Sequence, residues 1–141
     1  MTHADMEAFF AQRQKAWETY DPEALAEAHA EDGVLESLVG GTVRGRDAIK
    51  NIYVAWMFAF PDVQFQTEHL LVDGNRAAQF TKMTGTHRGE FCGLAATGRR
   101  FSVRCAFLFV FVDGKIAQEI RVYDFTGLLV QLGVLKATPA F

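Results

Sequence analysis

The sequence predicts an α+β fold in one domain over residues 1–141, and three observations lead to this. Apolar residues in the first half recur at helical spacing, whereas the second half consists of long segments with strand patterning. Two of the three Asp-Gly pairs, Asp73-Gly74 and Asp113-Gly114, lie between strand-like segments and are typical of hairpin turns. A length of 141 residues suits one domain with a substantial core. Helices followed by a meander of strands are the α+β pattern.

The first half contains three amphipathic segments that predict helices. In the first of them, Arg13 occupies the one polar step of the apolar stripe, and its stem can lie along the apolar surface. Asp21-Pro22 predicts a cap and a first helical turn, and Pro61 ends the third helix. The elements expected in this half are helices over Met6–Tyr20, Pro22–Asp32 and Arg46–Phe60, with a short strand over Val34–Leu38.

The second half predicts two hairpins and a closing helical turn. Asp73-Gly74 and Asp113-Gly114 each join two long segments that are rich in β-branched and aromatic residues. The elements expected in this half are strands over Val63–Val72, Asn75–Phe91, Arg100–Val112 and Lys115–Phe125, with a helical turn over Gly127–Gly133.

The register of the second hairpin follows if Asp113-Gly114 is a two-residue turn, because Val112 then faces Lys115 and Asp124 faces Val103. One face of the hairpin is then apolar apart from Gln118, and Asp124 lies at its end. A β-bulge would shift this register and exchange the two faces. The apolar face in this register holds Val103, Cys105, Phe107, Phe109, Phe111, Ile116, Ile120 and Val122.

Asp124 is the first candidate for chemistry in this arrangement. A carboxylate among apolar side chains is costly unless it is paired or neutral, and burial raises its pKa toward the range useful for proton transfer. Two structural interpretations compete with this one. Asp124 could cap a helical turn that begins near Thr126, or it could lie at the solvated end of its strand.

Composition and motifs disfavour several classes of function. The net charge is −3 and no run of Lys or Arg is present, so neither nucleic acid binding nor a basic membrane surface is expected. No apolar stretch reaches the length of a membrane span. Two cysteines, Cys92 and Cys105, are too few for a secreted disulfide scaffold, which favours free thiols and a cytoplasmic location. The spacing of His3, His29 and His69 supports no metal site, and no phosphate-binding loop is present, so no cofactor is expected.

An ordered set of short segments resembles a known family. Together the segments are similar to the SnoaL-like polyketide cyclase family, within the nuclear transport factor 2-like superfamily, over residues 5–135. The resemblance implies a cone, in which helices pack on a strongly curved antiparallel sheet around a deep apolar pocket. It also implies a homodimer. The segments are Phe60–Val63, Gly85–Phe91, Thr97–Arg100, Asp113–Ile116, Tyr123-Asp124 and Gln131–Gly133.

The resemblance implies an intramolecular aldol condensation without metal or organic cofactor. Asp124 matches the family's acid/base residue, which removes a proton from a carbon between two carbonyl groups. Family cyclases also place an assisting His on the preceding strand. Residues 107–111 hold no polar side chain, so stabilisation of the oxyanion has to come from elsewhere.

Further candidates for the site have competing structural roles. His87 lies in a segment that matches the family and is a second catalytic candidate, although it could instead stabilise a turn. Glu36 is a candidate for the pocket wall or for a solvent-facing strand position, and Tyr53 and Trp56 are candidates for the wall or the helix core. The residues expected to bind substrate are Glu36, Tyr53, Trp56, Val103, Cys105, Phe107, Ile120 and Val122.

Three functions remain open on these grounds. The first is a cyclase-like lyase or isomerase that acts on a small hydrophobic carbonyl compound. The second is a non-catalytic binding protein for such a ligand. The third is an isomerase or epoxide hydrolase of the same fold, although the predicted register turns Arg104 and Arg121 away from Asp124. Arg104 and Tyr123 are expected to stack on the far face of the sheet, where a homodimer would form.

Overall fold

The α+β class is confirmed by a computed structural model, which describes residues 1–137. One six-stranded sheet has the order β2-β1-β6-β5-β4-β3. Four helices accompany it in the described range, and none of them is long and apolar enough to cross a membrane. The elements are α1 (His3–Glu18), α2 (Pro22–Glu27), β1 (His29–Ser37), β2 (Gly41–Arg44), α3 (Arg46–Ala59), β3 (Gln64–Asp73), β4 (Arg76–Thr86), β5 (Arg100–Val112), β6 (Lys115–Tyr123) and α4 (Phe125–Gln131).

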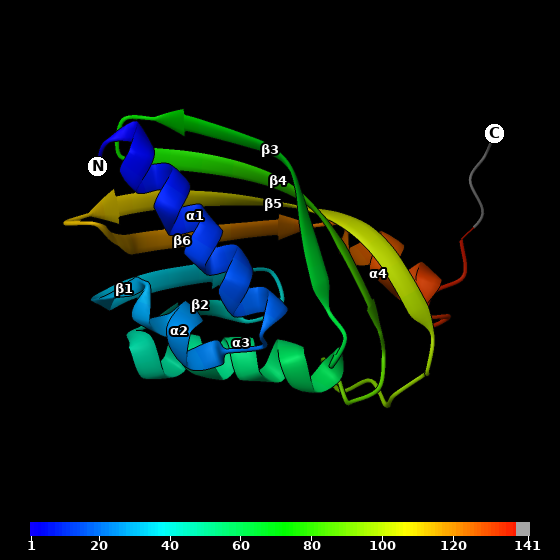
Figure 1. Ribbon diagram of the computed structural model, residues 1–141. Coiled ribbons are helices and arrows are strands. Elements are labelled where there is room, and N and C mark those ends of the chain that lie inside the picture. Colours follow the sequence, from blue (N-terminus) through cyan, green and yellow to red (C-terminus); the bar gives the residue numbers. More distant parts are fainter. Residues whose placement is uncertain (138–141) are drawn as a thin grey trace.

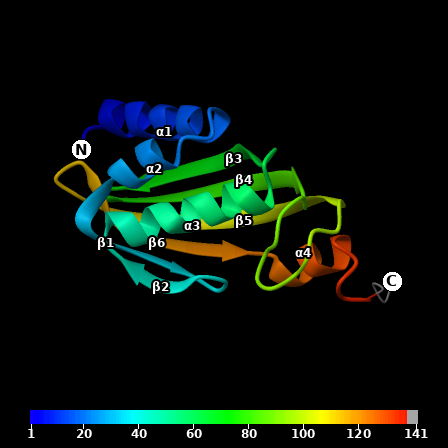
Figure 2. The ribbon, with the colours of Figure 1, turned by 90° about the horizontal axis from the view of Figure 1, so that it is seen from below.

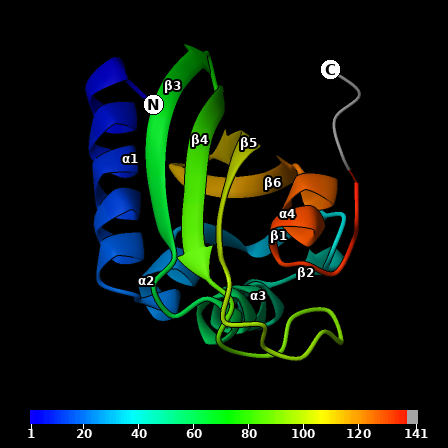
Figure 3. The same ribbon diagram turned by 90° about the vertical axis from the view of Figure 1, so that its right-hand side faces the viewer.

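The sheet is strongly curved, and its strands β3 to β6 form the expected antiparallel meander (Figures 1 and 3). The expectation of a wholly antiparallel sheet is wrong at one place, because β1 pairs with β6 in parallel. The helix predicted over Pro22–Asp32 is also too long, because α2 ends at Glu27. The chain enters β1 at His29, where the Ile116 amide donates to the Ala28 carbonyl and joins this segment to β6.

Helices α1, α2 and α3 cover the concave face of the sheet (Figure 2). Their aromatic side chains belong to the hydrophobic core between helices and sheet. Phe109 shows the pattern, because it is fully buried and its ring meets Phe10 of α1 and Phe107 of its own strand. Burying a Phe side chain stabilises a fold by about 1.5–3 kcal/mol, so rows of such rings hold the helices on the sheet.

A β-bulge in β6 changes the register that the sequence predicted. Phe111 pairs with Ile116 as expected, but Val110 pairs with Gln118, which leaves Ala117 as an extra residue. Beyond this point every side chain of β6 faces the opposite side from the prediction. Glu119 and Arg121 therefore point into the core, and Val122 is 64% exposed.

Candidate functional site

Five polar side chains meet in the apolar core beneath α1. Each is at most 5% exposed, and they come from four different elements that the curvature of the sheet brings together. Buried charges are costly unless they are paired, so such a group is a candidate for function rather than for packing. This group, called the buried cluster below, consists of Arg13 on α1, His29 on β1, Tyr53 on α3, and Glu119 and Arg121 on β6.

Glu119 is the centre of the buried cluster and accepts hydrogen bonds from the other four members. Its Oε1 atom accepts from the Tyr53 hydroxyl at 3.0 Å, from His29 Nε2 at 3.1 Å and from Arg13 Nη2 at 3.4 Å. Its Oε2 atom accepts from Arg121 Nε. A carboxylate oxygen has two lone pairs, so Oε2 keeps one for a further partner, whereas Oε1 is saturated.

His29 is held in the buried cluster through both of its ring nitrogens. Its Nδ1 atom lies 3.0 Å from the Leu25 carbonyl oxygen, and its Nε2 atom lies 3.1 Å from Glu119 Oε1. Both neighbours are hydrogen-bond acceptors. These two contacts hold the His29 ring in one orientation beside Glu119.

Charges within the buried cluster set the ionisation of its members. Burial by itself would raise the pKa of Glu119, but the charges of Arg121 and Arg13 and the hydrogen bond from His29 outweigh it, so this pKa lies well below its ordinary value. Burial raises the pKa of Tyr53, and the charge of Arg13 opposes this. Glu119 is therefore a carboxylate and Tyr53 a neutral phenol at neutral pH.

Arg121 is a member of the buried cluster with an unused hydrogen-bond donor. Its Nε atom is bound to Glu119, whereas its buried Nη2 atom has no hydrogen-bond partner among the described residues. The guanidinium lies 4.8 Å from the centre of the Tyr53 ring and 5.8 Å from that of Phe107. A free N–H donor therefore lies beside the oxygen of Glu119 that has a free lone pair.

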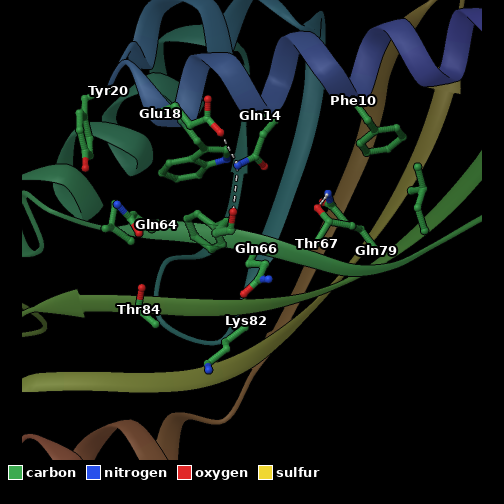
Figure 4. A pocket seen from close by; sticks show the side chains of 14 residues that line it. Phe10, Gln14, Glu18, Tyr20, Gln64, Gln66, Thr67, Gln79, Lys82 and Thr84 are labelled. Atoms are coloured by element: carbon green, nitrogen blue, oxygen red, sulfur yellow. Dashed lines mark hydrogen bonds between the residues drawn. The ribbon is translucent and has the colours of Figure 1, made fainter.

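A groove of about 850 Å³ opens between α1 and the edge strand β3 (Figure 4). Gln14 of α1 crosses it and donates from Nε2 to the Phe65 carbonyl oxygen at 3.0 Å, and Gln79 donates to Thr67 at 2.8 Å. Aromatic rings and amide groups alternate along its wall, which suits a ligand with both flat apolar and oxygen-bearing parts. The lining residues are Phe10, Gln14, Trp17, Glu18, Tyr20, Val63, Gln64, Phe65, Gln66, Thr67, Leu70, Gln79, Lys82 and Thr84.

Arg13 connects the groove to the buried cluster. Together with Phe107 and Thr81 it lines a void of about 10 Å³ that lies beneath the groove and shares Gln14, Trp17 and Phe65 with it. That volume is about the size of one water molecule. Phe107 also meets the Arg121 guanidinium, so a shift of this ring would join the void to the buried cluster.

Asp124 does not lie in the environment that the sequence predicted for it. It is exposed, and its carboxylate accepts a hydrogen bond from the Gly127 amide at 2.8 Å, which makes it the N-cap of α4. The bulge in β6 accounts for this difference. The Arg104 carbonyl accepts a hydrogen bond from the Asp124 amide at 3.3 Å, but the Arg104 guanidinium is bound to Glu68 on the outer face of the sheet.

The other predicted polar residues are also spread over the fold. His87 is fully buried, and its Nδ1 atom accepts from the Thr97 amide at 3.2 Å, away from the buried cluster. Glu36 is half-buried beside Gln118, and its β1 neighbour Leu35 takes the core position instead. The expected stacking of Tyr123 on Arg104 is wrong, because the Tyr123 ring packs on Trp56 in the core.

The predicted apolar lining is placed correctly on β5 and incorrectly on β6. Val103, Cys105 and Phe107 are buried on the concave face as expected, whereas Ile120 is half-buried and Val122 is exposed. Trp56 lies in the aromatic core between α3 and the sheet. Tyr53 is the predicted site residue that does belong to the buried cluster.

Sequence reasoning missed four members of the buried cluster. Arg13 was visible as the one polar step in an apolar helical stripe, and that pattern could have marked it as a site residue. Glu119 and Arg121 were assigned to the outer face by the register. His29 was not connected to any carboxylate, because its partner lies 90 residues away in the sequence. No group of three or more metal-ligating side chains occurs among residues 1–137.

Comparisons with known proteins agree with this fold. The family model for SnoaL-like polyketide cyclases matches residues 9–132. Aklanonic acid methyl ester cyclase DnrD from Streptomyces peucetius is 44% identical over 55 residues, and this match covers 39% of the chain but only 38% of that enzyme.

Solved structures with this fold are similar over nearly the whole chain. AclR, a proposed hydroxylase from Streptomyces galilaeus, superposes with a TM-score of 0.85 at 29% identity, covering 99% of this chain and 91% of its own. IdmH, a proposed polyketide cyclase from Streptomyces antibioticus, gives 0.76 at 26% identity, covering 91% and 98%. The helical cover, the curved sheet and the match over residues 9–132 lead to one conclusion: the chain belongs to the SnoaL-like polyketide cyclase family.

Proposed function

We propose that this protein is a cofactor-independent cyclase that closes a ring in a polyketide-type carbonyl compound, with the buried cluster as its catalytic centre. The observation that carries the proposal is the pair formed by Glu119 Oε2, which has a free lone pair, and Arg121 Nη2, which has no partner. A proton acceptor beside a positively charged donor is the arrangement that enolate chemistry needs. Membership of the family and the similarity to DnrD support the same chemistry.

The proposed step is an intramolecular aldol addition in which atoms and electrons balance. Glu119 Oε2 takes a proton from the carbon between two carbonyl groups, and Arg121 Nη2 donates to the carbonyl oxygen that becomes the enolate. The enolate carbon then forms a bond to a second carbonyl carbon, and the resulting alkoxide takes the proton back from Glu119. Because Glu119 is a weak base, the positive charge of Arg121 has to carry much of the catalysis.

The ligand is proposed to reach the buried cluster from the groove between α1 and β3. Its distal part would lie along the amide and aromatic side chains of the groove, and its reacting end would pass Arg13 and Phe107. Closure of these side chains behind the ligand would exclude water and strengthen the electrostatic effect of Arg121.

Replacing Glu119 by glutamine is expected to reduce turnover about 10²–10⁴-fold, because the amide cannot accept the substrate proton. The assay uses aklanonic acid methyl ester, the compound in the name of DnrD, and follows the cyclised isomer by liquid chromatography with mass spectrometry. Far-ultraviolet circular dichroism checks that the variant is folded. Glu119→Asp keeps the charge and should retain part of the activity.

Asp124→Asn is the matched control, because Asp124 is the carboxylate that the family resemblance predicts as acid/base. Our proposal expects this variant to keep most of the wild-type turnover. If Asp124→Asn abolishes turnover and folded Glu119→Gln does not, Asp124 is the acid/base residue and the buried cluster is structural. If ligand binds without turnover in the wild-type protein, the non-catalytic alternative holds.

Epoxide hydrolysis is a second candidate, because the buried cluster combines a carboxylate, two arginines and a tyrosine, and Arg13 also lines a void of about the size of one water molecule. In this reaction Glu119 would take a proton from the water while the water oxygen bonds to an epoxide carbon and the C–O bond of the ring breaks. Tyr53 or Arg121 would stabilise the resulting alkoxide, which would then take the proton back from Glu119 to give the diol. Formation of a diol from styrene oxide, lost in Glu119→Gln, would favour it over cyclisation.

We also propose that two copies of the chain pair through the outer face of the sheet. Phe80, Ala106 and Val122 lie side by side on β4, β5 and β6, and Phe80 and Val122 are 45% and 64% exposed. Val122→Lys is expected to turn a dimer into a monomer in analytical ultracentrifugation, because a charge cannot be buried there. Phe58→Lys changes an equally exposed residue on α3 and should leave the dimer intact. A monomeric wild-type protein at micromolar concentration would contradict the pairing.

A further inference from the structure

The buried cluster contains more positive than negative charge. Arg13 and Arg121 are each 5% exposed, and Glu119 is the one buried carboxylate among the described residues. Two guanidinium groups therefore share one carboxylate. Buried charges are normally paired, so this excess points to a negatively charged partner that is not part of the chain.

Arg121 is placed to receive that partner. Its guanidinium is held at one end by Glu119 and lies 4.8 and 5.8 Å from the centres of the Tyr53 and Phe107 rings. The Nη2 atom has no hydrogen-bond partner in the described part of the chain. A guanidinium fixed in this way loses little entropy on binding, and its donors match the geometry of anionic oxygens.

We propose that the ligand of the buried cluster is bound as an anion, with a carboxylate or enolate oxygen on Arg121 Nη2, and that neutral analogues of the same shape are rejected. This inference rests on the proposed function, in that a small molecule has to reach the buried cluster, and it specifies the substrate class: a hydrophobic acid or an acidic 1,3-dicarbonyl compound. A neutral ester that cannot ionise to an enolate, unlike the acidic 1,3-dicarbonyl substrate of the proposed cyclase, would leave the positive excess without compensation.

The test compares 2-naphthoate with methyl 2-naphthoate, two ligands of nearly the same shape that differ in charge. Isothermal titration calorimetry at neutral pH should show that the acid binds at least about tenfold more tightly than the ester. The preference should persist at high salt, because buried charges are screened much less than surface charges. Equal affinity for the two ligands, or a preference that disappears at high salt, would overturn the inference.

Arg121→Met should remove the preference, since the methionine keeps the apolar stem but has no donor or charge. Arg121→Lys keeps the charge but not the planar fork, so it should retain a reduced preference. Arg76→Met is the control, because Arg76 is an exposed arginine that pairs only with Asp73 at a hairpin, and it should behave like wild type. If Arg76→Met and Arg121→Met have the same effect, the inference is wrong. If Arg121→Met does not fold, the comparison of 2-naphthoate with methyl 2-naphthoate on the wild-type protein tests the inference by itself.

A second arm distinguishes a carboxylate from an enolate as the bound group. Benzoylacetone ionises to an enolate with a different ultraviolet spectrum, so a pH titration with excess protein reports its ionisation when bound. Selective stabilisation of the enolate should lower the midpoint by at least about one pH unit, which is tenfold in the equilibrium. A preference for 2-naphthoate without a lowered midpoint for benzoylacetone identifies a carboxylate as the group that the protein binds. A lowered midpoint identifies an enolate as that group.

The outcomes separate this inference from the proposed cyclase activity. 2-Naphthoate has no acidic carbon and cannot cyclise, so its binding reports charge selection alone. Turnover of aklanonic acid methyl ester without any preference for the acid would overturn the inference and leave the cyclase proposal standing. A clear preference for the acid over the ester without turnover would overturn the cyclase proposal and leave this inference standing.

Discussion

Replacing Glu119 by leucine is expected to lower the free energy of unfolding by about 3–5 kcal/mol, the usual result of removing one partner from a buried ion pair. Glu119 is completely buried and is the acceptor for Arg13, His29 and Arg121 at once. Its loss leaves two guanidinium groups in the core without a counter-ion and His29 without its acceptor. Urea denaturation followed by tryptophan fluorescence measures the effect, because Trp17 lies in the core near the buried cluster.

A triple variant separates the effect of losing the carboxylate from the effect of leaving two buried arginines without a counter-ion. The triple variant carries Arg13→Met, Glu119→Leu and Arg121→Met. It removes the two guanidinium groups together with their acceptor, so it should recover much of the stability that Glu119→Leu alone loses. Activity and anion binding should not return with it. A single Glu119→Leu variant as stable as wild type would show that Glu119 is not ionised in the core.

The second large effect is expected in acid. The pKa of Glu119 is well below its ordinary value in the folded protein, and it returns to about 4.3 in the unfolded chain. At pH values between the folded-state and unfolded-state pKa of Glu119, the unfolded state therefore binds a proton that the folded state does not bind. The stabilisation from Glu119 is fully present above about pH 4.3 and is lost as the pH falls toward the folded-state pKa.

A comparison of wild type with Glu119→Gln isolates this effect. Asp62 and Glu68 also have lowered pKa values: burial of Asp62 is outweighed by hydrogen bonds from Thr86, and Glu68 is bound by Arg104. Both residues remain in the variant. Urea unfolding between pH 3 and 7 should therefore show a steeper acid decline for wild type than for Glu119→Gln. Parallel curves would contradict the ionised state assigned to Glu119.

Much of the fold could be predicted from local patterns, because helices and hairpins are set by neighbouring residues. The apolar stripe of α3, the turns at Asp73-Gly74 and Asp113-Gly114, and the inward face of β5 all follow from periodicity and turn chemistry. The parallel pairing of β1 with β6 could not be predicted in this way. It joins segments about 80 residues apart, as in the pair of Leu35 with Glu119, and no local signal specifies such a contact.

The candidate site was predicted less well than the fold, and one residue explains most of the difference. Ala117 is an ordinary strand residue, and nothing in its neighbourhood distinguishes a bulge from regular pairing. Side chains alternate along a strand, so this single insertion moved Glu119 and Arg121 inward and put Val122 in solvent. Asp124, which was predicted for the apolar face, became the cap of α4 instead.

By itself the sequence determined the α+β class, the order of the elements other than the short strand β2, and the resemblance to a cyclase family, since these depend on patterns within short segments. The tertiary structure alone decided which charges meet in the core. Arg13, His29 and Tyr53 come from three different elements, and they reach Glu119 because a curved sheet and a bulge direct them to one point. The physical reason is that a buried charge is stabilised by its partners in space, and those partners are distant in the chain.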